Sequence, residues 1–177
     1  MTGSIEITVA DGTDAARAVQ AFPDWTTAEL DRIASFGHRG QAQPGDVLIT
    51  AGRRPVPAFV LRAGVLEVCA VLPGAPEGVV VARHHPGSVI AEMAVLTGQA
   101  SPIEVRAQTQ VAFDVLGEPE VRRLVATQAD LGDKLLRALA ARREVLREGL
   151  VASATRVIGD RRRLRDHVTV VLVNPIS

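Results

Sequence analysis

The sequence predicts a mainly β domain with helices at both ends, an α+β fold whose core is a β-sandwich, roll or barrel. Residues 38–117 contain short apolar segments separated by Gly and Pro turns, a spacing typical of all-β domains. Helical periodicity is found before and after that segment. The chain has 177 residues, 47% of them hydrophobic, which is enough to bury one sizeable core.

Composition narrows the classes of function. Twenty basic residues balance twenty acidic ones, which argues against a protein that coats nucleic acid. Cys69 is the single cysteine, so neither an intramolecular disulfide nor a cysteine zinc cluster is expected, and its apolar strand predicts a buried thiol. The N-terminus lacks the pattern of a secretory signal, and no apolar run reaches the ~18–20 residues that span a bilayer. We therefore expect a cytoplasmic protein without membrane contact, and the Ala/Val/Arg/Gly-rich usage is typical of bacterial proteins.

The N-terminal part predicts a strand and two helices. Residues 1–20 are polar and mixed, and we assign them to an N-terminal extension with a strand in "IEITV" followed by a short helix. The next helix begins after Thr26, which can cap it with Glu29 as the capping-box partner, and ends at Gly37. Its apolar side chains fall on one face, as a helix packed on a sheet requires: Leu30, Ile33 and Phe36.

The β segment is expected to contain a hairpin. The stretch "PAFVLRAGVLEVCAVLP" reads as two strands hinged at Ala63 and Gly64. A loop over 74–78 and a strand over 79–85 follow, and residues 103–117 supply two more strands around "QTQ".

Helices return after Gly117. The stretch "EPEVRRLVAT" has acid and Pro in its first turn, which favours a helix start, and the segment 129–150 is the longest periodic helix. This second helix either packs on the β domain or a partner helix, or forms the seam of a parallel homodimer. The basic run at 161–165 is interpreted as a solvated face, with apolar runs on both sides. The leucine stripe of the long helix comprises Leu131, Leu135, Leu139, Leu146 and Leu150.

The turn-punctuated strands and the segment that follows them resemble the cyclic nucleotide-binding domain family. The strands are "PGDVLITAG" (44–52) and "AFVLRAGVLEV" (58–68), and the family's ligand cassette is similar to "HPGSVIAEMAVLTG" (85–98). The resemblance covers about residues 21 to 150 and implies a double-stranded β-helix, or jelly-roll β-roll, between an N-terminal helix and a long C-terminal helix. We accordingly assign residues 21–152 to this domain and 153–177 to a tail or the start of a linker.

The resemblance also implies a ligand site. A cyclic phosphate can be cradled by backbone N–H groups at the start of a short helix, while an arginine donates charge-assisted hydrogen bonds to the phosphate. The amides of this cassette would come from Ala91, Glu92, Met93 and Ala94. Glu92 would accept the ribose 2′-hydroxyl proton, although an acid at a helix start also stabilises the helix dipole without touching a ligand.

The cassette departs from the family pattern at three positions. Ala91 stands at the family's glycine, Ser101 at its arginine, and Pro102 follows. Ala91 is expected to keep the amide cradle only if its φ is negative. Losing the charged hydrogen bond costs about 1.5–3 kcal/mol, which is tenfold to over a hundredfold in affinity. Pro102 removes a further N–H from the same wall.

Three other arginines are candidates to replace the cassette arginine as a donor to the phosphate. Arg106 lies five residues after Ser101, so alternation along a strand predicts that it points to the opposite face. Arg83 and Arg53 lie on neighbouring segments, and nothing in the sequence orders them toward the cassette.

The C-terminal part is similar to a second pattern. The stretches at 129–150 and 156–168 resemble the segment that joins a cyclic-nucleotide-binding-like domain to a thioredoxin-reductase-like flavoprotein in some bacterial proteins. Those regulatory domains often lack the cassette arginine. The chain carries neither a glycine-rich dinucleotide fingerprint nor a C-x-x-C pair, so the resemblance implies a regulatory module for a flavoprotein reductase domain.

Two rival functions fit poorly. A transcription factor would need a winged helix-turn-helix of roughly 60–70 residues after the long helix. A cupin metalloenzyme would need converging histidines, but His84 and His85 are adjacent and expected to be surface or turn residues, with His38 and His167 far off. We therefore expect no catalysis, metal or cofactor. The function is either a sensor for a cyclic nucleotide or other small anion, with weak, altered or lost nucleotide binding, or a structural or protein-interaction module without a ligand.

Overall fold

Two antiparallel sheets flanked by helices form the structure, a computed structural model that describes residues 5–10, 23–72, 75–141 and 167–172. The first sheet has six strands in the order β10-β1-β6-β5-β8-β3, and the second has four in the order β2-β9-β4-β7. This confirms the α+β fold and the jelly-roll arrangement of its β-roll. The strands are β1 (Ile5–Ala10), β2 (His38–Ala42), β3 (Val47–Ile49), β4 (Ala58–Ala63), β5 (Leu66–Leu72), β6 (Ala75–His84), β7 (Val89–Ile90), β8 (Ile103–Ala107), β9 (Val111–Leu116) and β10 (His167–Leu172). The helices are α2 (Thr27–Ala34), α3 (Glu92–Thr97), α4 (Glu118–Thr127) and a further helix whose described part spans 129–141.

Helix α2 begins as predicted. The Thr26 side chain accepts a hydrogen bond from the Glu29 N–H, and the Glu29 carboxylate accepts one from the Thr26 N–H at 2.7 Å. The predicted end at Gly37 is wrong, because the helix stops at Ala34 with Ser35 as its C-cap. Gly37 is needed for another reason: a Cβ there would collide with the carbonyl oxygen of Val115 on β9.

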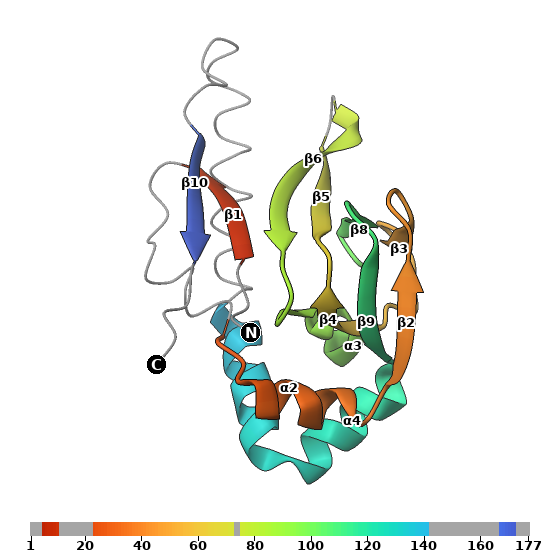
Figure 1. Ribbon diagram of the computed structural model, residues 1–177, viewed down its shortest axis with the longest axis vertical. Coiled ribbons are helices and arrows are strands. Elements are labelled where there is room, and N and C mark those ends of the chain that lie inside the picture. Colours follow the sequence, from red (N-terminus) through yellow and green to blue (C-terminus); the bar gives the residue numbers. More distant parts are fainter. Residues whose placement is uncertain (1–4, 11–22, 73–74, 142–166, 173–177) are drawn as a thin grey trace.

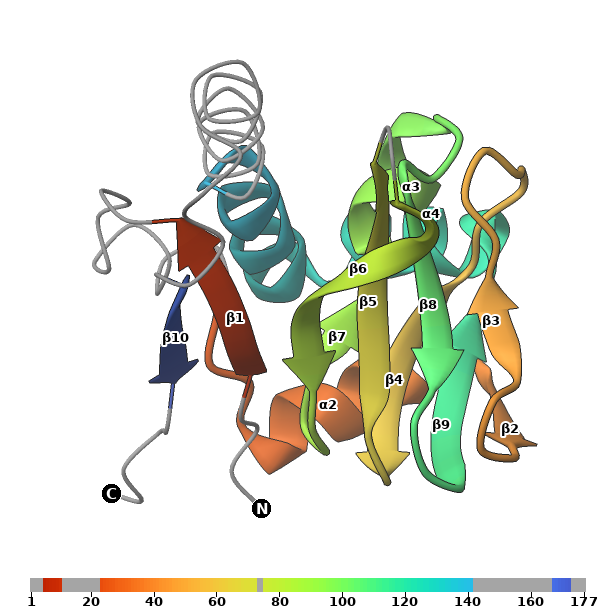
Figure 2. The ribbon, with the colours of Figure 1, turned by 90° about the horizontal axis from the view of Figure 1, so that it is seen from above.

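The predicted hairpin at Ala63 and Gly64 is also wrong. Strand β4 pairs with β7 and β9, whereas β5 pairs with β6 and β8, so the chain crosses from one sheet to the other at this point (Figure 2). Gly64 has φ +81°, a left-handed conformation that glycine adopts freely. The predicted loop at 74–78 instead belongs to β6 from Ala75 onward, since that strand pairs with β5 down to Leu72.

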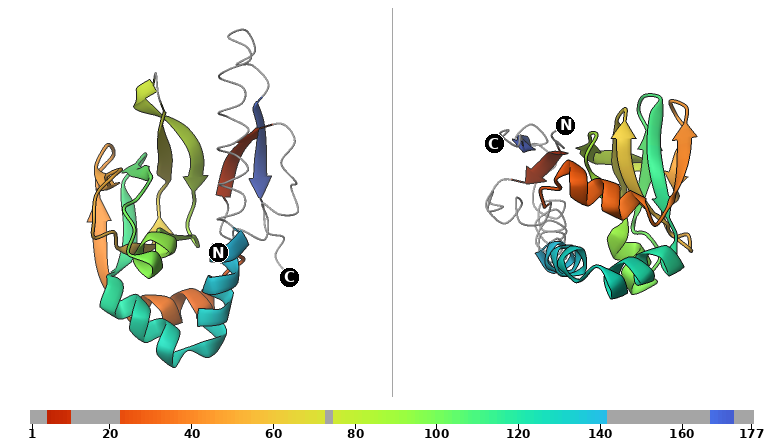
Figure 3. Two further views of the ribbon diagram at one scale, coloured as in Figure 1. Left: turned by 180° about the vertical axis from the view of Figure 1, so that it is seen from behind. Right: turned by 60° about the horizontal axis from the view of Figure 1, so that its bottom comes forward.

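The core has two layers. One cluster fills the space between the two sheets and includes an edge-to-face pair, Phe59 and Phe113, with ring centroids 5.2 Å apart. The other lies where the helices cover the four-stranded sheet (Figure 3). Its fully buried members come from α2, from β4 and β9, from α4 and from the helix over 129–141: Ile33, Val60, Leu116, Val121, Leu124, Leu131 and Leu135.

The helix over 129–141 buries its leucine stripe inside its own domain. Leu131 and Leu135 are buried and Leu139 is half-buried. The alternative in which this stripe packs on the domain is therefore confirmed for its described part. Leu146 and Leu150 lie outside the described residues, and the homodimer seam stays a prediction.

The predicted strand at "IEITV" is present as β1, and it pairs along its whole length with β10. β1 also pairs with the end of β6 through three residues, so segments near the two ends of the chain lie side by side in one sheet (Figure 1). The short helix expected before residue 20 and the basic run at 161–165 lie outside the described residues. None of the helices in the described part is both long and apolar enough to cross a bilayer.

Candidate functional site

The segment predicted to hold a ligand forms a strand, a short helix and a second strand: β7, α3 and β8. Ala91 is the N-cap of α3, with φ 64° and ψ 9°. The condition of a negative φ is therefore not met, because Ala91 takes a left-handed backbone, which glycine adopts freely but a residue with a Cβ adopts only under strain. Among the described non-glycine residues, Ala91 alone has a positive φ, and such a backbone costs alanine about 1–2 kcal/mol.

Helix α3 presents its first turn directly after Ala91. The N–H groups at the start of a helix have no partner within the helix, so those of Glu92, Met93 and Ala94 are the amides that this segment can offer. Ala94 is half-buried and packs against the core between the sheets. The side chains of Glu92 and Met93 lie outside the described residues, so both roles considered for Glu92 stay predictions.

Ser101 is buried, and its hydroxyl is hydrogen-bonded to the backbone of Ile103. It is 3% exposed, and its hydroxyl donates to the Ile103 carbonyl at 2.7 Å and accepts from the Ile103 N–H at 3.3 Å. Pro102 is exposed and carries no N–H. Ser101, which the resemblance aligns with the family's arginine, therefore closes a turn before β8 and supplies no charged donor.

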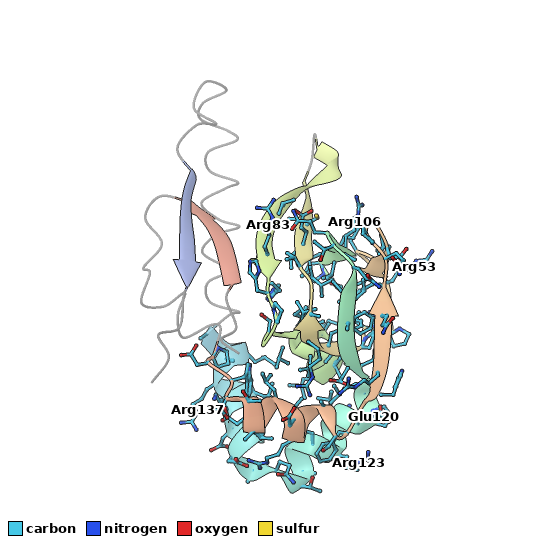
Figure 4. The ribbon with its side chains drawn as sticks, viewed as in Figure 1. Arg53, Arg83, Arg106, Glu120, Arg123 and Arg137 are labelled. Atoms are coloured by element: carbon cyan, nitrogen blue, oxygen red, sulfur yellow. The ribbon has the colours of Figure 1, made fainter. Side chains whose placement is uncertain are left out.

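The three candidate arginines are not gathered at Ser101. Arg106 is exposed and pairs with Glu104 at 2.5 Å, and Arg83 pairs with Glu67 at 3.0 Å. Arg53 lies beside Ser101 through the main chain, because its carbonyl accepts the Ser101 N–H at 3.4 Å, but its side chain is exposed. Figure 4 shows the three side chains spread over β6, β8 and the segment after β3.

Within the described ranges, no three His, Cys, Asp or Glu residues are placed to hold a metal ion. His84 is buried at the end of β6, which corrects the expectation of a surface or turn residue. The prediction for Cys69 is confirmed: it is buried, and burial raises the pKa of its thiol, so it is held in the unreactive form.

The sequence analysis did not predict a charge network beside α2, which is centred on the buried Asp114. The Arg62 Nε donates to Asp114 Oδ2 at 2.6 Å, and Arg62 Nη1 donates to Asp31 Oδ1 at 2.8 Å. A register shift in β4 between Leu61 and Ala63 places Arg62 as the extra residue of a bulge, a feature that re-aims side chains. Burial acts to lower the pKa of Arg62, but its bonds to the two carboxylates outweigh this and raise it. The signal in the sequence was one lone charge in each of two apolar strands, "AFVLRA" and "VAFDVL".

An open hollow of about 330 Å³ lies over this network, away from the cassette. Its charged groups already face one another, since Arg39 on β2 lies 3.6 Å from the Asp114 carboxylate that Arg62 holds. The hollow is lined by Asp31, Ala34, Ser35, Gly37, Arg39, Arg62 and Asp114.

Comparison with solved structures shows the same fold in bacterial regulators. The catabolite activator protein of Thermus thermophilus aligns with a TM-score of 0.61 and 20% identity, over 75% of this chain, which spans 60% of that protein. A protein from work on a cyclic-GMP-dependent signalling pathway in bacterial phytopathogenesis aligns at 0.55 and 19% identity, over 78% of this chain and 98% of its own. The N-terminal domain of a transcriptional regulator from Streptomyces coelicolor A3(2) aligns at 0.55 and 18%, over 87% of this chain and 99% of its own.

Comparison of the sequence with curated proteins found no match. The sequence pattern of the cyclic nucleotide-binding domain family matches residues 39–128, which is just over half of the chain. This segment contains the β-roll from β2 to β9, the cassette helix α3 and α4. The chain therefore belongs to the cyclic nucleotide-binding domain family.

Proposed function

We propose that this protein is a non-catalytic regulatory domain whose affinity for cyclic AMP and cyclic GMP is weak, altered or lost. The observation that carries the proposal is the hydrogen bonding of Ser101, which stands where the family has an arginine. Its hydroxyl is hydrogen-bonded to the Ile103 backbone. Without that charge, a bound cyclic phosphate loses about 1.5–3 kcal/mol of charge-assisted hydrogen bonding. Regulators with the same fold, including one from a cyclic-GMP-dependent pathway, support the regulatory role.

The proposed site consists of the cassette residues Ala91, Glu92, Met93, Ala94, Ser101 and Pro102. Although φ at Ala91 is positive, the residue holds, under strain, a backbone conformation that is open to glycine, and on that ground we propose that the amide cradle is retained. Amides alone attract a small anion through their dipoles, but they give less selectivity for a cyclic nucleotide than an arginine fork does. The ligand class is therefore a cyclic nucleotide bound weakly, or another small anion.

A second candidate is a structural or protein-interaction module without a small ligand. The packing of the helix over 129–141 supports it, because Leu131 and Leu135 are buried in the domain core and make this helix part of the fold. In this alternative the domain at residues 21–152 would serve a partner, such as a flavoprotein reductase domain or a second copy meeting along the helix at 129–150.

Calorimetric titration of the full chain with cyclic AMP and cyclic GMP tests the proposal. We expect binding in the high micromolar range or weaker, and low micromolar binding would contradict it. The variant Ser101→Arg should bind at least tenfold more tightly, because it restores the charged donor beside an intact cradle. Ser101→Ala is the matched control, since it loses the same hydroxyl without adding charge. If neither the natural chain nor Ser101→Arg gives heat at millimolar nucleotide, the interaction-module alternative is supported instead.

A further inference from the structure

Four charged side chains of alternating sign form a row along the hollow beside α2. Asp31 on α2 is held by Arg62 of β4 at 2.8 Å, and Arg62 in turn holds Asp114 of β9 at 2.6 Å. Arg39 on the edge strand β2 lies 3.6 Å from the other oxygen of the Asp114 carboxylate. We refer to these four residues as the charge row. It begins with the carboxylate of Asp31 and ends with the guanidinium of Arg39.

The two inner members of the charge row are committed to their neighbours. The Asp114 side chain is 5% exposed and that of Arg62 is 24% exposed. Arg62 uses Nε and Nη1 on the two carboxylates, while its Nη2 reaches the Leu30 carbonyl at 3.5 Å. Removing either inner charge would leave the other one buried without its partner. The inner pair therefore has a structural role, and it holds Asp31 in place beside the hollow before any ligand binds, which lowers the entropic cost of binding.

The two terminal members of the charge row keep most of their bonding capacity. The Arg39 side chain is 86% exposed, and among the described residues none of its N–H groups has a hydrogen-bond acceptor. The Asp31 side chain is 62% exposed, and in the same part of the chain its Oδ1 accepts a hydrogen bond while its Oδ2 accepts none. The Arg39–Asp114 contact is long and solvated, so a ligand can replace it at little cost.

The charges of the row indicate which ligand the hollow suits. A carboxylate fits Arg39, because a planar guanidinium donates two parallel hydrogen bonds to it. An ammonium group fits the open oxygen of Asp31, and the Ser35 hydroxyl, which also lines the hollow, can accept a further hydrogen bond. A lone anion would be repelled by the two carboxylates of the row, and a lone cation by its two guanidinium groups. The neutral row is therefore complementary to a ligand that carries both charges.

The geometry also limits the size of that ligand. Arg62 and Asp114 lie between the terminal members, and in the described part of the chain no ion pair joins Asp31 to Arg39. The two charges of the ligand therefore have to be separated by several bonds. The volume of about 330 Å³ is at the lower end of the range of small-molecule pockets, which is about 300–1,000 Å³.

We propose that this hollow binds a small zwitterion whose ammonium group and carboxylate lie at opposite ends of a short chain, the chemical class of the ω-amino acids. The carboxylate is bound by Arg39 and the ammonium group by Asp31. None of the cassette residues lines the hollow, so this site is separate from the proposed nucleotide site. It gives the regulatory domain a second ligand that does not depend on the missing cassette arginine.

An NMR titration of the isotope-labelled full chain tests this proposal, with 5-aminopentanoate as the probe. Pentanoate and pentylamine are matched probes, because each keeps the same chain and lacks one of the two charges. At neutral pH and constant ionic strength, we expect 5-aminopentanoate to shift the amide signals of Ser35, Gly37 and Arg39 with a Kd of about 1 mM or below. Each single-charge probe should bind at least about tenfold more weakly, because it loses one charged hydrogen-bonding partner.

Two variants remove the terminal charges one at a time. Asp31→Asn keeps an oxygen that can accept the Arg62 hydrogen bond, and Arg39→Gln keeps a polar side chain on β2. Each should weaken the binding of 5-aminopentanoate about tenfold. The matched controls are Asp133→Asn and Arg137→Gln, which remove the same charges from an exposed pair on the helix over 129–141, outside the hollow. The controls should leave the Kd unchanged.

Three outcomes would overturn the proposal. If 5-aminopentanoate shifts none of these amide signals at about 20 mM, the hollow does not bind this class of ligand. If pentanoate or pentylamine binds as tightly as the zwitterion, the site selects a single charge and the assigned class is wrong. If Asp31→Asn and Arg39→Gln bind like their controls, the charge row does not form the site. Because no nucleotide is added, failure here is distinguishable from failure of the proposed nucleotide site.

Discussion

Replacing Ala91 with glycine should stabilise the protein, although glycine within structured segments usually destabilises. The φ of 64° at Ala91 costs a residue with a Cβ about 1–2 kcal/mol, and Ala91→Gly removes that strain. The loss of a half-buried methyl group offsets about 0.4 kcal/mol, and the greater freedom of glycine in the unfolded chain offsets about 0.5 kcal/mol. A net gain of about 0.1–1.1 kcal/mol remains, and its middle value of about 0.6 kcal/mol corresponds to a rise in Tm of about 1–2 °C for a chain of this size.

Urea unfolding followed by far-UV circular dichroism measures this difference directly, because the midpoint shifts while the slope stays constant. The control is Ala94→Gly, which makes the same substitution three residues later inside α3. Ala94 is half-buried and helical, so this variant should lose about 1–1.5 kcal/mol through helix propensity and burial. Opposite signs for the two variants are therefore expected. If Ala91→Gly destabilises the protein as much as Ala94→Gly does, Ala91 does not hold a left-handed backbone and the argument for an intact cradle fails.

Two further predictions concern the charges around α2. Arg62→Leu should lower the free energy of unfolding by about 3 kcal/mol, because it leaves the buried Asp114 carboxylate without its main partner. Arg39→Leu removes an exposed and longer contact to the same carboxylate and should change the free energy of unfolding by less than about 0.5 kcal/mol. Equal urea midpoints for the two variants would contradict this prediction. Acid should weaken the Glu29–Lys134 and Arg32–Asp130 ion pairs. Burial acts to raise the pKa of Glu29, but hydrogen bonds from Lys134 and Thr26 outweigh this effect and lower that pKa. The hydrogen bond from Arg32 lowers the pKa of Asp130 to about 2. Carboxylates with a lowered pKa stabilise the fold above their ordinary values of 4.5 and 3.8, and that contribution is lost as the pH falls toward about 2. Urea unfolding at successive pH values should show this loss of stability in the natural chain and a smaller loss in Lys134→Met.

Local patterns predicted several features correctly. The capping box of Thr26 and Glu29 could be read from residue spacing, because the side chain and backbone groups concerned lie within one helical turn. Arg106 is exposed and Ser101 is buried, but Ser101 lies in the turn before β8, so alternation along a strand does not relate the two. The burial of Leu131 and Leu135 followed from helical periodicity, which identifies an apolar face but leaves its partner open.

Features that depend on distant partners were predicted poorly. The turn at Gly64 was visible, but a turn does not specify which strands pair, and the hairpin was therefore assigned in place of a crossing between sheets. The burial of His84 was missed, because the residue is flanked by the preceding strand β5 and by β1, which comes from the distant N-terminal part of the chain. The Arg62–Asp114 pair joins residues 52 positions apart and could only be suspected from two lone charges.

The candidate site shows the same division. From the sequence alone come the prediction of the cassette and the prediction that Ser101 stands in place of its arginine, since the order and spacing of residues define that pattern. Only the tertiary structure decided that Ala91 takes a glycine's backbone, that the Ser101 hydroxyl is bound to Ile103, and that Arg83 and Arg106 are held by Glu67 and Glu104. The physical reason is that residue type sets which conformations and contacts are low in free energy within a turn or two of the chain. The conformation adopted and the partner bound depend on strands and helices that meet only when the whole roll has closed.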